Sequence, residues 1–183
     1  IAPTVACCSR IDAVLSGSEA QPLGAGNIVG LRVGVLQGYV LDGLEKAVVD
    51  AFDLALSILS QAGANLVDVC FDSLTEIPEC NRNGGFAAAE SYAWHRHHIE
   101  TARKRYDPRV LSRILRGKEM SAVEYLELQQ NRRRIIANAG RSFADIDVWV
   151  MPTVPRIAPS ITELESDDET YCEANAALLR NPG

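Results

Sequence analysis

The sequence predicts an α/β fold in which a parallel β-sheet is flanked by helices. Three consecutive segments carry this prediction: an apolar strand at residues 31–36, an amphipathic helix at 41–63 and a second apolar strand at 65–71. A strand, a helix and a strand joined by short connections form a right-handed βαβ unit, so the two strands lie parallel in one sheet. With 183 residues, 47% of them hydrophobic, the chain suits one domain with a substantial core.

A helix is predicted at residues 4–16, closed by Gly17 and followed by a loop rich in glycine and serine at 18–30. Its core-facing positions recur at helical spacing: Val5, Cys8, Ile11, Asp12 and Leu15. On this pattern Cys7 and Cys8 behave as small hydrophobic side chains rather than as reactive thiols.

The helix at 41–63 has the clearest amphipathic pattern in the chain. Asp42 and Glu45 resemble a capping box, and Gly63 supplies the left-handed residue that ends the helix. One apolar stripe faces the sheet: Leu44, Val48, Phe52, Ala55, Leu59 and Ala62.

The second half is predicted to be mostly helical. A loop at 75–85 precedes a helix near 86–104. Asp107 and Pro108 then begin a short helix that Gly117 ends, and Ser121 and Glu124 form a capping box that opens a long helix to about residue 143. An apolar strand at 148–151 leads into a loop stiffened by three prolines, an acidic loop at 163–170 and a helical stretch that reaches Leu179.

Charge and composition exclude several classes of partner. The net charge is −6 and the sequence pI is about 5.1, so the chain lacks the basic surface that nucleic-acid binding requires. No segment approaches the roughly 20 apolar residues of a membrane span, and the first residues lack the order of a signal peptide. Five cysteines with no CxxC spacing favour free thiols in a reducing cytoplasm.

A metal site is not expected. His95 and His98 lie on one side of the helix near 86–104, with Glu90 about one turn before them. Zinc needs three or four converging ligands, usually from HExxH or cysteine pairs, and the sequence has neither. The glycine-rich fingerprints of nucleotide cofactors are also missing, so we expect no cofactor.

A stripe of three arginines and one further arginine on an apolar face are candidates for specific polar contacts. Arg109, Arg113 and Arg116 share one face of the short helix, which is either a solvated surface or a binding face for a substrate carboxylate. Arg132 falls on the apolar arc of the long helix, where a structural ion pair is the expected role.

No nucleophile can be assigned. None of the serines lies in a GxSxG elbow or in a Gly/Ser-rich loop with donors for an oxyanion, and the cysteines and histidines have no spacing typical of a thiol hydrolase.

Several segments, in their order along the chain, resemble the second half of the amidase signature family. The most specific is D-x-x-x-x-PT-x-P-x-x-AP, which begins at Asp147. The other matching segments are IAPTVACCSRIDAVLSG, LRVGVL, QAGANLVDV, GGFAAAESYAWHR, YDPRVLSRILRG, SAVEYLELQQNRRRI and NAALLRNPG. The chain is similar to bacterial amidases that hydrolyse small carboxamides or urea derivatives, rather than to the tRNA-dependent amidotransferase subunit.

This resemblance implies part of a large mixed β-sheet flanked by helices and the hydrolysis of a carboxylic amide. The family uses a serine nucleophile, a second serine in a cis peptide and a lysine that relays protons. None of these maps onto this sequence, because Lys46, Lys104 and Lys118 lie in unsuitable contexts. We therefore expect residues 1–183 to be a single incomplete domain, a fragment with the catalytic groups upstream and no activity by itself. The family also usually has aspartate at the position of Cys7, so the cap of the first helix is expected to be weaker here.

Because no catalytic residue maps onto this chain, the candidate site residues are ones expected to line the substrate pocket. Arg113 is expected to meet a polar or carboxylate-bearing substrate, and Thr153 to offer a hydroxyl at the carboxyl edge of the sheet. Tyr92 and Trp94 are candidates for the entrance, with core packing as the alternative role of each. The expected partners are a small amide substrate and, because exposed strand edges invite pairing, a second copy in a homodimer or swapped assembly.

Two other hypotheses remain open at this point. One is a truncated, non-catalytic scaffold or interaction module that kept the fold and lost the chemistry. The other is an unrelated α/β binding domain, which fits the βαβ unit but not the order of the matching segments.

Overall fold

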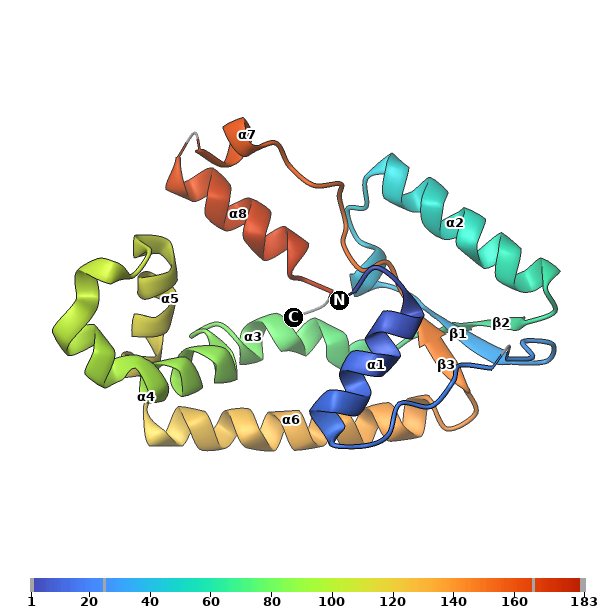
Figure 1. Cartoon of the computed structure of the whole chain (residues 1–183), viewed down its shortest axis with the longest axis horizontal. Helices are drawn as coiled ribbons and strands as arrows, with labels where there is room; N and C mark the ends of the chain where they lie inside the picture. The colour runs from blue at the N-terminus through green and yellow to red at the C-terminus, as the bar shows by residue number, and fades with distance from the viewer. Residues whose placement is uncertain (1, 25, 166, 182–183) are drawn as a thin grey trace.

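The computed structural model describes residues 2–24, 26–165 and 167–181 of the chain (Figure 1). The described part contains three short strands and eight α-helices: α1 (Val5–Ser16), β1 (Arg32–Leu36), α2 (Lys46–Gln61), β2 (Asn65–Val69), α3 (Ile77–Cys80), α4 (Gly85–Ala102), α5 (Pro108–Glu119), α6 (Ala122–Ser142), β3 (Val148–Val150), α7 (Ile161–Glu165) and α8 (Asp168–Leu178). Short 3₁₀ turns lie at Tyr39–Leu41, Asp72–Glu76 and Arg103–Arg105. None of the described helices is both long enough and apolar enough to cross a membrane.

The three strands form one parallel sheet in the order β2-β1-β3. Val33 pairs with Leu66 of β2 on one side and with Val148 of β3 on the other. The predicted βαβ unit is confirmed, since β1 and β2 are parallel neighbours joined through α2. The α/β class is likewise confirmed, with helix predominating over a small sheet.

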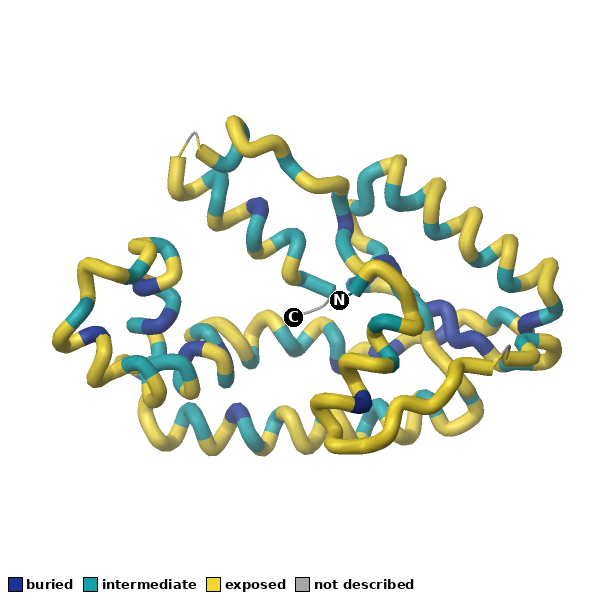
Figure 2. Tube along the Cα trace, viewed as in Figure 1, coloured by how far each residue is buried: buried dark blue, intermediate teal, exposed yellow. Residues whose placement is uncertain are grey.

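The main core lies on the face of the sheet that α6 covers. Leu36 and Val40 are almost fully buried there with Val69 and Phe71, and α6 contributes Ile135 and Ala139. Figure 2 shows this concentration of buried residues on β1, whereas α2 has no buried residue. A groove of about 370 Å³ separates α2 from the opposite face of the sheet, so this helix packs loosely.

Four of the predictions about local structure are wrong. Glu45 is the residue before α2, but no side chain caps that helix, and the Glu45 carboxylate accepts from the amide of Ile157 instead. The predicted loop at 75–85 contains α3 in place of irregular chain, and part of the predicted acidic loop at 163–170 is helical, within α7 and α8. The short helix does not end at Gly117 but continues to Glu119.

Helix α1 has the predicted ends but not the predicted burial. The Thr4 hydroxyl accepts a hydrogen bond from the Cys7 amide at 3.1 Å, and Gly17 is left-handed as expected. Its apolar stripe faces solvent, with Leu15 82% exposed and Cys8 exposed. The prediction that this face packs on the core is therefore wrong within the described residues, where only Ala13 of α1 is buried.

Arg32, at the start of β1, pairs with the residue that precedes β3. Its guanidinium lies 2.8 Å from Asp147 Oδ1, and its backbone amide donates to Asp147 Oδ2 at 2.8 Å. These hydrogen bonds, the side-chain one first, lower the pKa of Asp147 from 3.8 to about 2. The pair thus joins the ends of two neighbouring strands and fixes the entry of β3 into the sheet.

We expect the free energy of unfolding to decrease at low pH as the Asp147 carboxylate is protonated. Because the pKa of Asp147 is lower in the folded chain than in the unfolded chain, its contribution is complete above about pH 5 and is lost as the pH falls toward 2. Asp147→Asn should therefore lower Tm at pH 7 and leave a smaller difference from the wild type at pH 2. Thermal unfolding of both proteins across this range measures the effect, and a difference in Tm that does not change with pH would contradict it.

Candidate functional site

The carboxyl ends of the three strands lie at one edge of the sheet. β1 continues into Gln37, β2 into Cys70, and β3 into Met151, Pro152 and Thr153. In α/β proteins with open parallel sheets, ligands bind beyond this edge. The segment 151–160, which we call the rim loop, is the longest irregular connection there and carries the exposed hydroxyl of Thr153.

Glu45 holds the rim loop through three contacts. Its backbone amide donates to the carbonyl of Pro155 at 2.8 Å, and its carboxylate accepts from the amide of Ile157 at 3.1 Å. Arg156 lies between two carboxylates, 3.5 Å from Glu45 and 3.0 Å from Glu163 of α7. The prolines remove backbone freedom and these contacts fix the rest, so the loop is a rigid rim.

We expect Glu45→Gln to loosen the rim loop selectively. The amide of Ile157 would lose a charge-assisted acceptor, and Arg156 would lose one of its two carboxylates. Hydrogen exchange at Ile157 should accelerate about tenfold, with little change in β1. Lys46→Gln, which removes an exposed ion pair with Asp50 on the same helix, is the matched control and should leave this exchange rate unchanged. Equal exchange at Ile157 in all three proteins would refute the clamp.

Asn181 and Arg180 fasten the end of α8 to the same edge. The Asn181 amide donates to the carbonyls of Val40 and Pro152, at 3.0 and 2.7 Å. Arg180 donates to the carbonyl of Asp42 at 2.6 Å and lies 5.5 Å from the ring centre of Tyr39. Residues more than a hundred positions apart therefore meet where β1 and β3 end.

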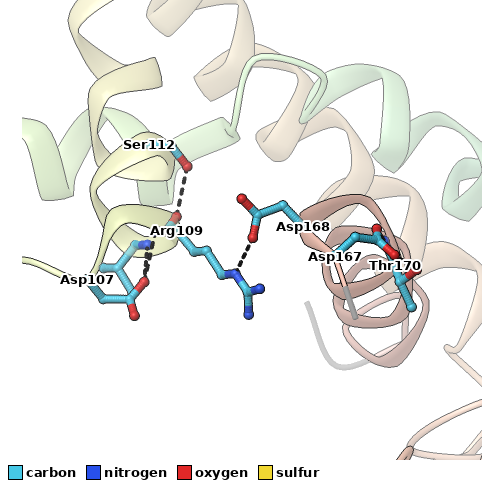
Figure 3. Close-up of polar contacts among 7 residues, drawn as sticks. Asp107, Arg109, Ser112, Asp167, Asp168 and Thr170 are labelled. Atoms are coloured by element: carbon cyan, nitrogen blue, oxygen red, sulfur yellow. Dashed lines mark hydrogen bonds and ion pairs between the residues drawn. The ribbon is translucent and has the colours of Figure 1, made fainter. Parts of the chain in front are cut away.

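A second polar cluster joins α5 to α8 (Figure 3). Arg109 Nε lies 2.7 Å from Asp168 Oδ1, and its guanidinium stacks over the ring of Tyr171 at 4.3 Å. The hydrogen bond to Asp168 raises the pKa of Arg109. Asp107 caps α5 by accepting from the amides of Arg109 and Val110, as predicted. Arg109 is thus committed to holding α8.

Arg113 lies one helical turn further along α5 and is half-buried. Its guanidinium carbon is 5.7 Å from the ring centre of Tyr171, and it forms no ion pair with any described residue. The arginine stripe is therefore divided: Arg109 is occupied by Asp168, Arg116 is exposed, and Arg113 presents a partly desolvated guanidinium without a carboxylate.

The four residues predicted to bind substrate lie on three elements. Arg113 is on α5 and Thr153 in the rim loop, and Figure 1 shows that α5 and the start of the segment between β3 and α7 lie apart. Tyr92 of α4 packs against the small core of Ile99, Leu111 and Ile114, while Trp94 on the same helix is 77% exposed. In the described residues, no hydrogen bond or ring contact joins any two of the four.

Two of the histidines and one of the lysines have local partners in the described part of the chain. His95 Nδ1 lies 2.9 Å from the hydroxyl of Tyr106, and His97 lies 3.8 Å from Glu100. The described ranges contain no group of three His, Cys, Asp or Glu side chains placed to hold a metal. Lys46 pairs with Asp50, and no lysine in the described part of the chain hydrogen-bonds to a serine.

The sequence patterns do not predict the contacts that Glu45 and Asn181 make. The sequence pattern predicts a capping box for Glu45, but its carboxylate reaches a loop residue 112 positions away. Asn181 belongs to one of the matching segments, but its spacing gives no sign of the two carbonyls that it bridges. Arg132 was expected in an ion pair and makes none with a described residue; Arg134, two positions later, pairs with Glu76 instead.

Comparison with known proteins gives one consistent result. A family model described as Amidase matches residues 9–180. The 2-amino-5-chloromuconic acid deaminase of Comamonas testosteroni is 35% identical over 154 residues, which cover 84% of this chain and 33% of that protein. The 1-carboxybiuret hydrolase subunit AtzE of Pseudomonas sp. (strain ADP) is 30% identical over 181 residues, covering 94% of this chain and 38% of that protein.

Solved structures agree on the fold. A crystal structure of an amidase superposes with a TM-score of 0.72 at 20% identity, over 98% of this chain and 42% of that one. At that identity the likeness establishes the fold alone. The chain spans about a third of the length of the two curated relatives.

Proposed function

The chain belongs to the amidase family, and from that premise we propose that it forms part of an enzyme that hydrolyses a carboxylic amide. Water adds across the C–N bond, so the products are a carboxylate and ammonia. The observation that carries the proposal is the match over residues 9–180, which includes both the sheet and the rim loop. In this role residues 9–180 orient the substrate and form part of the pocket wall at the carboxyl edge of the sheet.

We propose that the groups that attack the amide lie outside residues 1–183. The family's serine and lysine relay has no counterpart in the described part, where Lys46 pairs with Asp50 and no lysine hydrogen-bonds to a serine. The chain alone is then an incomplete domain with no amidase activity. The exposed thiols of Cys8, Cys70 and Cys172 suit a reducing cytoplasm.

The proposed substrate bears a carboxylate. Both relatives have such a group in the names of the compounds on which they act, 2-amino-5-chloromuconic acid and 1-carboxybiuret. Arg113 offers a half-buried guanidinium with no ion-pair partner among the described residues, which suits bidentate recognition of a carboxylate. Thr153 lies apart from Arg113 and is proposed separately, as a hydroxyl for substrate at the carboxyl edge of the sheet.

A chimera tests the proposal. Residues 9–180 replace the matching segment of the 2-amino-5-chloromuconic acid deaminase, and ammonia release is measured from a carboxylate-bearing amide and from its neutral methyl ester. We expect activity from the chimera and none from the isolated chain. A chimera that folds, as judged by circular dichroism, and releases no ammonia would favour the alternative of a non-catalytic scaffold, which the missing nucleophile supports.

In an active chimera, Arg113→Gln should raise KM for the carboxylate-bearing amide about tenfold or more and leave KM for the neutral ester within about twofold. The reason is that a charge-assisted pair contributes about 1.5–3 kcal/mol when it is partly desolvated. Arg116→Gln, on the exposed side of the same helix, is the control. Equal KM ratios for Arg113→Gln and the parent would remove Arg113 from the substrate site.

A homodimer or swapped assembly is proposed for the isolated chain. β2 and β3 are both edge strands, and apolar side chains such as Leu54 and Trp149 are exposed by 61% and 47%. Open strand edges and apolar faces promote association. Light scattering checks this proposal, which a strictly monomeric mass at micromolar concentration would contradict.

A further inference from the structure

An apolar groove of about 270 Å³ lies between α3, α4 and α6. Its apolar walls are Ile77 and Cys80 of α3, Phe86 of α4 and three side chains of α6, namely Leu128, Ile135 and Ile136, and the polar Asn81 also lines it. Leu128 is buried and Ile136 is 53% exposed, so the groove grades from a closed floor to an open mouth. Burying an apolar chain here would remove it from water without unfolding any element.

Arg132 is the one charged side chain that lines this groove among the described residues. It follows Leu128 by four positions and precedes Ile136 by four, so the three lie in one row on α6. The row explains why the sequence places an arginine on an apolar arc. The guanidinium lies at the edge of a hydrophobic surface, where solvent screens its attraction to an anion less than on an open face.

Arg132 also has no carboxylate partner among the described residues. Arg134, on the same helix, pairs with Glu76 of the 3₁₀ turn Asp72–Glu76. Arg132 forms no ion pair there, although Glu90 of α4 lines a neighbouring depression with Arg132 and Arg133. Two guanidinium groups against one carboxylate leave this end of the groove net positive.

We propose that the groove binds a small apolar monocarboxylate, with the hydrocarbon part against the isoleucines and Phe86 and the carboxylate on Arg132. An amphipathic anion matches both halves of the site. A neutral alcohol of equal length lacks the ion pair, and an alkylammonium would be repelled by Arg132. The groove volume suits a hydrocarbon chain of about six to ten carbons. Each methylene that is buried in the groove should tighten binding about fourfold until the groove is filled.

The test is a titration of the full chain with hexanoate, octanoate and decanoate, followed by backbone amide shifts. We expect saturable shifts in α3, α4 and α6, affinity that rises with chain length, and at least tenfold weaker binding of octanol and octylammonium. Arg132→Gln should weaken octanoate about tenfold. Arg141→Gln, on the same helix and hydrogen-bonded to Asn138, is the control and should bind as the wild type does.

A second variant guards against a loss of folding. Ile136→Glu places a carboxylate one turn from Arg132 at an exposed position, so it should keep the amide spectrum of a folded chain and abolish octanoate binding. Octanoate binding that survives both Arg132→Gln and Ile136→Glu, or shifts that map to other helices, would overturn the proposal. The absence of saturable binding to the wild type would do the same. None of these readouts depends on amidase activity.

Discussion

Gly117→Ala is expected to lower the free energy of unfolding by about 3 kcal/mol, because it would force α4 and α5 apart. A Cβ atom at this position would lie 2.0 Å from the carbonyl oxygen of Ala88, 2.5 Å from its carbonyl carbon and 2.9 Å from the amide nitrogen of Ala89. All three are backbone atoms of α4, so no side chain can rotate away to make room. The α4–α5 pair carries the small core of Ile99, Leu111 and Ile114, which would open with it.

Gly140→Ala is the matched control for this effect. Gly140 also lies inside a helix, α6, but a Cβ there would meet nothing within 4 Å. Alanine should therefore raise the free energy of unfolding by about 0.5–1 kcal/mol through its helix propensity. Urea unfolding followed by circular dichroism compares the two variants. If Gly117→Ala also proved neutral or stabilising, the close approach of the two helices would be wrong.

Gly117 also shows why one prediction from the sequence failed. A glycine after a basic amphipathic segment is typical of a helix end, because glycine tolerates the left-handed conformation. The same residue type permits two helix backbones to touch, and that use depends on Ala88, 29 positions earlier in the chain. Local patterns do not distinguish the two uses, and here the helix continues to Glu119.

Features that depend on neighbouring residues were predicted well. The capping box of Ser121 and Glu124 forms as expected, with hydrogen bonds of 2.8 and 3.2 Å. The βαβ unit follows from periodicity and from the left-handed Gly63. In each case the deciding contacts lie within a few positions or within one chain connection, where sequence patterns carry information.

The candidate site depended on distant contacts, and these were not predicted. The acceptor of Ile157 is Glu45, and Asn181 joins Val40 to Pro152. Arg109 and Arg113 have equivalent positions on one helix face, yet only Arg109 meets a carboxylate, because Asp168 at the start of α8 reaches one turn of α5. Which member of a charged stripe remains available is thus decided by another element. The stripe alone offers three arginines as candidates, and the role of Arg113 in binding substrate stays a prediction.

The second large effect is expected from Leu36→Ala, which should lower the free energy of unfolding by about 3 kcal/mol. Leu36 ends β1 with none of its side chain exposed, against Val40, Val69 and Phe71. Alanine would leave a cavity between the sheet and α6 in addition to the lost burial. Because β1 is the central strand, the same cavity would loosen Gln37 and the chain that follows it at the carboxyl edge.

Leu54→Ala makes the same chemical change at a side chain of α2 that is 61% exposed, and it should alter the free energy of unfolding by no more than about 0.5 kcal/mol. Chemical denaturation of both variants separates burial from side-chain identity. Hydrogen exchange at Ile157 then tests whether Leu36→Ala also weakens the Ile157–Glu45 contact, which joins the rim loop to the residue before α2 and lies outside the core. Faster exchange at Ile157 in Leu36→Ala but not in Leu54→Ala would link the core under α6 to the rim of the site. Equal destabilisation by the two variants would mean that Leu36 is not the centre of the core, and the packing of β1 on α6 would have to be revised.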